Sequence, residues 1–132
     1  FRSPQTMVYY GLMAGIAFGV FEGVQYQTTI NIRADYTTAF ILNIARLTSL
    51  PFIHAIWCGI AGYFIGMAGL YPRYRHALWF LALVIPATLH GLYDSFASVF
   101  YLFSLGIAFL SVILLMAYMR HSGKLRERLR TN

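Results

Sequence analysis

The sequence predicts an all-α fold: a polytopic membrane helix bundle of about four transmembrane helices plus an interfacial helix. Of the 132 residues, 59% are hydrophobic and only 11% are charged, whereas a soluble domain carries roughly 25% charged residues. Four apolar segments are long enough to cross a hydrocarbon core of about 30 Å, which takes about 20 helical residues. This composition excludes a disordered chain, which needs low hydrophobicity, and argues against a water-soluble globule.

The predicted spans form one transmembrane bundle over residues 1–119, followed by a basic cytoplasmic tail over residues 120–132. The spans are expected at about 7–26, 51–70, 77–96 and 99–119. Between the first two, residues 36–47 mix apolar and polar side chains, which favours an amphipathic helix lying in the interface. Ser49 before Pro51 favours a new helix start, because one helix over 36–70 would be ~50 Å long. A kink at Pro51 is the alternative.

The placement of basic residues predicts that both termini lie in the cytoplasm. Eight of the ten Lys and Arg residues fall on the side of the two termini, and two fall on the other side. The side with the excess of Lys and Arg is normally cytoplasmic. Half of the basic residues follow the last span directly, which indicates attraction to anionic lipid headgroups and not to nucleic acid. Trp57 and Trp79 are expected to pack or to lie in the interfacial belts.

Glycines recur at helical spacing on the first two predicted spans. The glycine faces consist of Gly11, Gly15, Gly19 and Gly23 on the first span and Gly59, Gly62, Gly66 and Gly69 on the second. Small residues at such spacing let helix backbones approach closely in a membrane. We expect these faces to serve packing and to bring the neighbouring polar positions together.

Four ionisable residues lie inside the predicted spans, where insertion of a charge costs about 2.5–3.5 kcal/mol at mid-helix. They are Glu22 in the first span, His54 in the second, and His90 and Asp94 in the third. At 1.5 Å per residue, the first three lie roughly 5–8 Å from the outer ends of their helices, and Asp94 lies closer. Residues distant in the sequence are therefore expected at one level of the membrane.

Two imidazoles and two carboxylates are a suitable ligand set for zinc. A catalytic site would use three donors, His54, His90 and either Glu22 or Asp94, and would keep one position for water. The remaining carboxylate would orient a ligand or take a proton from that water. The alternative is that the four residues only neutralise one another as buried hydrogen-bonded pairs.

Three stretches carry motifs in a specific order. FGVFEGVQY at 18–26 contains F-x-x-x-E, PFIHAIWCGIAGYFIG at 51–66 contains a histidine followed by spaced glycines, and HGLYD at 90–94 is an H-x-x-x-D element. Together they resemble the PrsW family of intramembrane proteases, relatives of the CAAX-processing and Abi membrane peptidases, over about residues 7–96. The motifs carry over to Phe18 and Glu22, to His54, and to His90 and Asp94.

The resemblance implies a metal-dependent peptidase of the bacterial or archaeal plasma membrane that cleaves membrane-anchored regulators such as anti-sigma factors. We expect Glu22 to be catalytic and His54, His90 and Asp94 to bind a divalent metal, Zn²⁺. The family's E-E-x-x-K motif, on an earlier helix, should supply a catalytic glutamate, and it does not occur in this sequence. Either a preceding region carries it, which the start at Phe1 favours, or the protein is a non-catalytic member.

The leading hypothesis is hydrolysis of peptide bonds in membrane-anchored regulatory proteins near the extracytoplasmic face, in association with other membrane subunits. A second hypothesis is a non-catalytic scaffold or subunit that holds a partner's transmembrane helix against the glycine faces. A third is a small transporter in which the four ionisable residues relay protons. The transporter ranks last because these residues share one depth and do not cross the membrane.

Overall fold

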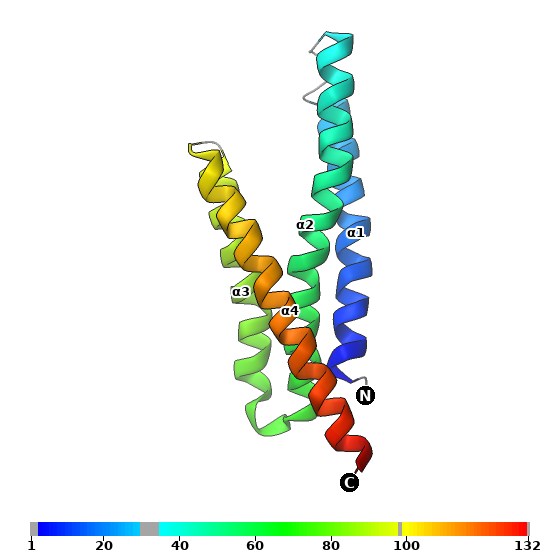
Figure 1. Ribbon diagram of the computed structural model, residues 1–132, viewed down its shortest axis with the longest axis vertical. Coiled ribbons are helices and arrows are strands. Elements are labelled where there is room, and N and C mark those ends of the chain that lie inside the picture. The colour runs from blue at the N-terminus through cyan, green and yellow to red at the C-terminus, as the bar shows by residue number, and fades with distance from the viewer. Residues whose placement is uncertain (1–2, 30–34, 98, 132) are drawn as a thin grey trace.

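The computed structural model describes residues 3–29, 35–97 and 99–131, and these residues form helices and short connections without a strand. The elements are α1 (Pro4–Thr29), α2 (Tyr36–Leu70), a short 3₁₀ turn η2 (Pro72–Tyr74), α3 (Arg75–Ala97) and α4 (Tyr101–Thr131). The long helices run up and down in turn, and both ends of the chain lie at the same end of the bundle (Figure 1). The predicted all-α bundle is confirmed.

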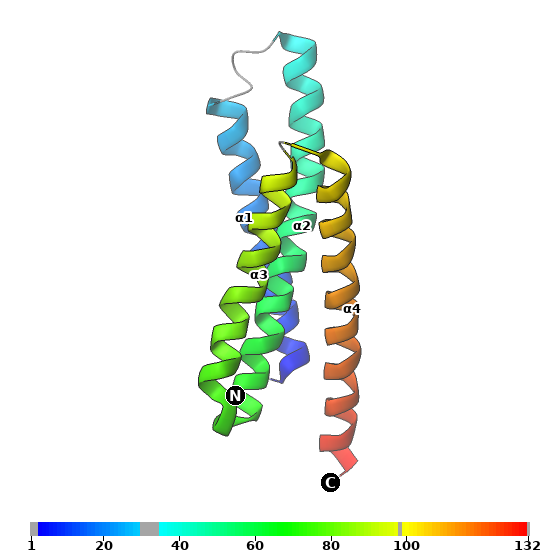
Figure 2. The same ribbon diagram turned by 90° about the vertical axis from the view of Figure 1, so that its left-hand side faces the viewer.

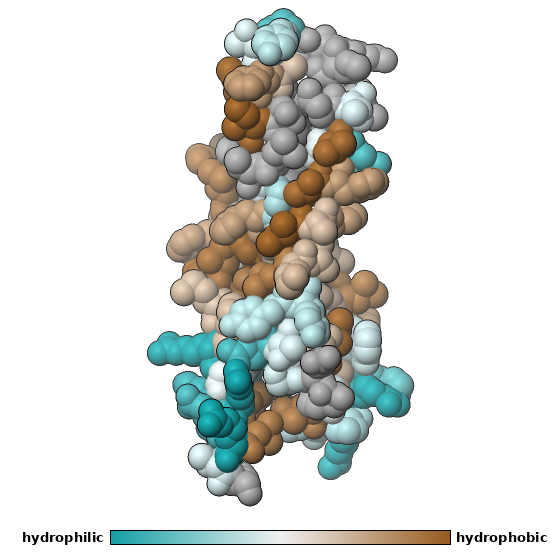
Figure 3. Space-filling model, turned by 90° about the vertical axis from the view of Figure 1, so that its right-hand side faces the viewer, coloured by the Kyte–Doolittle hydropathy of each residue, from teal (hydrophilic) through white to brown (hydrophobic). Residues whose placement is uncertain are grey.

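Each long helix contains a segment that is long and apolar enough to cross a membrane. These segments, Pro4–Gln25, Pro51–Leu70, Pro72–Phe96 and Leu102–Thr131, overlap the four predicted spans. Helix α4 continues to Thr131, so residues 120–131 of the predicted tail are helical. Large apolar side chains such as Phe21, Leu83 and Phe109 are exposed on the outer helices, as expected for surfaces that face lipid. Apolar residues dominate the middle of the face in Figure 3, and hydrophilic ones gather toward its lower end.

The central helix of the bundle is α2, which packs against the other three long helices. Its lower half supplies most of the core, including Ile56 and Ile60, and the other helices add Val8, Leu89 and Leu115. The most extensive contact joins α1 to α2, whereas the backbones of α1 and α3 do not approach each other closely within the described residues. Side chains of α2 can therefore be reached from α1 on one side and from α3 on the other.

The contact between α1 and α2 runs through the predicted glycine faces. A Cβ on Gly15 would overlap the backbone carbonyl of His54, and Gly11 and Gly62 likewise meet backbone atoms of the opposing helix. Only glycine allows two backbones to lie this close. These parts of the glycine faces are thus buried between α1 and α2, which removes the surface that the scaffold hypothesis assigns to a partner's helix.

The predicted helix break before Pro51 is wrong. A single helix of 35 residues runs from Tyr36 to Leu70 with Pro51 inside it, so residues 36–47 do not form a separate interfacial helix. Proline removes one backbone hydrogen bond, but α1 packs beside α2 and supports it as one continuous element. The start of α2 therefore rises beyond the connection between α3 and α4 (Figures 1 and 2).

Candidate functional site

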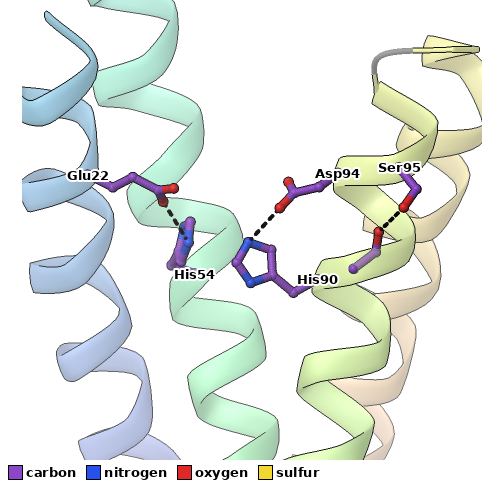
Figure 4. Close-up of polar contacts among 6 residues, drawn as sticks. Glu22, His54, His90, Asp94 and Ser95 are labelled. Carbon is purple, nitrogen blue, oxygen red and sulfur yellow. Dashed lines mark hydrogen bonds and ion pairs between the residues drawn. The ribbon is translucent and has the colours of Figure 1, made fainter. Parts of the chain in front are cut away.

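The four ionisable residues of the spans lie in one row across α1, α2 and α3. Glu22 Oε2 lies 2.9 Å from His54 Nε2, and His90 Nε2 lies 3.1 Å from Asp94 Oδ2. The two imidazole rings lie side by side between the two carboxylates (Figure 4), with centroids 5.2 Å apart. The structure thus brings together the residues that the sequence places at one depth.

The contact between Glu22 and His54 follows from the packing of α1 on α2. Gly15 sets the α1 backbone against the His54 carbonyl, and Glu22 follows seven residues later on the same face of α1. Side chains lean toward the N-terminus of their own helix. Because α1 and α2 are antiparallel, these two side chains lean toward each other.

This first pair is largely buried, with the His54 side chain 6% exposed and that of Glu22 27% exposed. The two facing atoms lie at ion-pair distance but without the alignment of a hydrogen bond. Apart from this contact, Glu22 Oε2 has no hydrogen-bond donor among the described residues. A buried carboxylate oxygen in this state is costly unless a hydrogen-bond donor or a positive charge reaches it.

The second pair is more open to the surroundings. The side chains of His90 and Asp94 are 37% and 66% exposed, and their spacing of four residues places them on one face of α3. Next to them, Ser95 Oγ donates to the carbonyl of Gly91 at 2.7 Å (Figure 4). The row therefore has a buried end at Glu22 and His54 and an open end at Asp94.

Trp57 belongs to the site, whereas the sequence predicts for it only packing or a place in the interfacial belts. Its ring stacks on His90, with centroids 4.7 Å apart and planes at 30°, and it meets His54 edge-on at 5.5 Å. The indole Nε1 donates to Ser111 Oγ at 3.0 Å, and Ser111 is fully buried in α4. The spacing of three residues from His54 was the signal in the sequence that Trp57 shares its face of α2.

Phe18 completes the surroundings of His54 from the side of α1, with ring centroids 5.1 Å apart. It precedes Glu22 by one turn, so the F-x-x-x-E motif places an aromatic ring and a carboxylate against the same imidazole. Aromatic side chains from two helices thus limit the orientations open to His54. A largely apolar wall also strengthens the electrostatic interactions among the charged groups that it encloses.

The donor set of this row fits zinc in its chemistry, since zinc takes imidazole nitrogen and carboxylate oxygen. Within the described part of the chain, however, no three His, Cys, Asp or Glu side chains already converge on one point. The arrangement consists of two imidazole–carboxylate pairs whose atoms are of the type that a metal would use.

Comparison with known proteins identifies a family. The model of the PrsW family of intramembrane metalloproteases matches residues 1–119. That range includes the whole of α1, α2 and α3 and most of α4, and hence every residue of the row described above. No curated protein and no solved structure matches the chain.

Proposed function

The chain belongs to the PrsW family of intramembrane metalloproteases, and we propose that it hydrolyses peptide bonds of membrane-anchored regulatory proteins. The observation that carries the proposal is the row of two adjacent imidazoles and two carboxylates inside a bundle of apolar helices. Ionisable groups at membrane depth are costly, and a cluster of them indicates a functional site. With the termini in the cytoplasm, the row lies toward the extracytoplasmic face.

We assign the binding of a divalent metal, Zn²⁺ by donor chemistry, to His54, His90 and Asp94. A bound metal of this kind activates water and polarises the carbonyl of a peptide bond. His90 and Asp94 project from successive turns of α3, so a single helix sets their relative positions. His54 comes from α2, where its contacts with Phe18 and Trp57 orient the ring.

Glu22 is the proposed catalytic base. It belongs to a separate helix, it is less exposed than Asp94, and its carboxylate lies beside the buried His54. A carboxylate in that position would accept a proton from the attacking water and deliver it to the leaving amine. Asp94 suits the role of metal ligand better, because it lies one turn from His90, a proposed metal ligand on the same helix.

The open end of the row supports access from the bilayer. Within the described residues the backbones of α1 and α3 do not approach each other closely, and the side chains of His90 and Asp94 remain partly exposed. A substrate anchored in the same membrane would reach the row by lateral diffusion in the bilayer, along the surface of α3. This route favours membrane-anchored proteins over soluble ones as substrates.

Cleavage in reconstituted membranes tests the proposed activity. The full-length protein is placed in liposomes with a single-span substrate, and Glu22→Gln is expected to lower the cleavage rate by about 10²- to 10⁴-fold. Asp35→Asn is the matched control, because it makes the same carboxylate-to-amide change at the exposed start of α2. Unchanged cleavage by Glu22→Gln, or equal loss in both variants, would rule out Glu22 as the base.

The alternative proposal is a non-catalytic scaffold or subunit that binds a partner's transmembrane helix. Its binding surface cannot be the portions of the glycine faces that α1 and α2 bury against each other. For a scaffold, Glu22→Gln and His90→Ala should leave partner binding and cellular phenotype intact. Loss of the phenotype at unchanged expression would exclude the scaffold.

A further inference from the structure

A second polar site lies at the other end of the bundle, between the first turn of α1 and the last turns of α4. It is a pocket of about 290 Å³, lined by Gln5, Gly123, Arg126, Glu127 and Arg130. Arg126 reaches across from α4 and donates from Nη1 to Gln5 Oε1 at 3.0 Å. Along α4, the pocket is several turns away from Ser111, the residue that accepts the hydrogen bond of Trp57 beside the row of ionisable residues.

The start of the first candidate span indicates the depth of this pocket. Gln5 belongs to the first turn of the candidate span Pro4–Gln25, and we take the start of this span as the edge of the hydrocarbon core on the side of the termini. Because Arg126 contacts Gln5, its guanidinium lies at this same level. The headgroup layer extends roughly 5–8 Å beyond the hydrocarbon on each side. Both Arg126 and Arg130 are exposed there and can meet a lipid from the surrounding bilayer.

The lining matches an anionic phosphodiester that also carries a hydroxyl group. Guanidinium groups bind phosphate oxygens through paired N–H donors, and Arg126 uses only part of its five donors on Gln5. Glu127 can accept a hydrogen bond from a headgroup hydroxyl. Two guanidinium groups and one carboxylate leave one positive charge in excess, which balances one phosphodiester.

We propose that this pocket binds the headgroup of an anionic glycerophospholipid, with its phosphate on Arg126 and Arg130 and its hydroxyl on Glu127. Phosphatidylglycerol has this chemistry, since it carries one negative charge and hydroxyl donors. Phosphatidylcholine lacks both the net charge and the hydroxyl. The site is independent of the proposed proteolysis, because it shares no residue with the row at the other end of the bundle.

A substitution at Gly123 can distinguish binding in a defined pocket from a general attraction between the basic tail and the membrane. A Cβ added at Gly123 would meet nothing within 4 Å. A larger side chain at this position would therefore occupy the pocket without changing any charge. Glycine inside a helix is less favourable than alanine by about 1 kcal/mol, so Gly123→Leu should not weaken α4. Gly106 is the matched control, because a Cβ there also meets nothing within 4 Å.

Native mass spectrometry tests the proposal on the full chain released from nanodiscs of equal parts phosphatidylglycerol and phosphatidylcholine. The wild type should retain phosphatidylglycerol selectively. Gly123→Leu and the double variant Arg126→Gln, Arg130→Gln should each reduce its retention by about tenfold or more, the equivalent of 1.4 kcal/mol. Gly106→Leu and the double variant Arg73→Gln, Arg75→Gln should retain it as the wild type does.

Three outcomes would overturn the proposal. Wild-type retention by Gly123→Leu would show that the pocket is not occupied. Equal loss in both double-arginine variants would show that general electrostatics hold the lipid. Displacement of the lipid by an equal concentration of inorganic phosphate would show that the pocket is a site for soluble anions. Unchanged helix content by circular dichroism confirms that each variant compared is folded.

Discussion

The backbone of Gly15 in α1 lies so close to that of His54 in α2 that a Cβ at position 15 would overlap the His54 carbonyl oxygen. The same approach of the two helices brings the Glu22 carboxylate within 2.9 Å of the His54 imidazole. A glycine that looks like a packing residue in the sequence therefore sets the geometry of two proposed site residues.

Replacement of Gly15 by alanine should destabilise the bundle and separate Glu22 from His54. The added methyl group meets backbone atoms, which cannot rotate away, and overpacking of this kind costs about 1–3 kcal/mol. We expect a lower free energy of unfolding for Gly15→Ala in a denaturant titration in detergent micelles. Gly106→Ala has open space around the new methyl group and should be neutral or slightly stabilising. Equal stability of the two variants would contradict the close contact.

Loss of the Ser111 hydroxyl should release Trp57. Ser111→Ala leaves the Trp57 indole N–H without its buried acceptor, which costs about 1–3 kcal/mol. Because Trp57 stacks on His90, we also expect weaker metal binding when it is measured under conditions where the variant is fully folded. Ser111→Thr keeps the hydroxyl and should restore binding.

Ser122→Ala is the control for the Ser111 prediction. Ser122 is also buried in α4, but its hydroxyl donates to the Met119 carbonyl of its own helix. Its removal should leave metal affinity unchanged. If Ser111→Ala and Ser122→Ala weakened metal binding equally, Trp57 would have no specific part in positioning His90.

The start of α2 should be sensitive to acid. Hydrogen bonds from the hydroxyl and then from the amide of Thr38 lower the pKa of Asp35 below its ordinary value of 3.8. A carboxyl with a lowered pKa stabilises the helix start above its ordinary pKa, and this stabilisation is lost as the pH falls through the lowered value. We expect hydrogen exchange of the backbone amides in the first turn of α2 to become faster as the pH drops below 3.8. The exchange rates are first corrected for the intrinsic dependence of amide exchange on pH.

Two variants make the Asp35 prediction specific. Asparagine is also a good helix cap but does not titrate, so Asp35→Asn should keep the first turn protected at every pH. Asp35→Ala should expose it at every pH. An identical pH response in the wild type and Asp35→Asn would show that another group is responsible.

The four spans and the shared depth of Glu22, His54 and His90 could be predicted from the sequence. Both depend on quantities counted along the chain, namely hydropathy over about 20 residues and a rise of 1.5 Å per residue. The spacing of four residues places His90 and Asp94 on one face of a helix. The pairing of His54 with Glu22 could not be predicted, because it depends on how α1 and α2 rotate against each other. The stacking of Trp57 on His90 escaped prediction for the same reason.

The continuity of α2 through Pro51 shows where local signals fail. Ser49 and Pro51 form a typical helix start, and the missing amide of the proline does weaken the helix locally. In the folded chain α1 packs extensively against α2, and most helical stability in proteins comes from such packing. Contact between helices therefore outweighs one lost hydrogen bond.

The metal content of the full-length protein tests the central claim most directly. Elemental analysis after purification without chelators should find about one zinc ion per chain in the wild type. His54→Ala and His90→Ala should contain almost no zinc, whereas Glu22→Gln should contain as much as the wild type. The control is His76→Ala, which removes an exposed histidine in the first turn of α3 and should also leave the zinc content unchanged. Absence of metal from the wild type, or equal metal in the wild type and both His54→Ala and His90→Ala, would contradict the account.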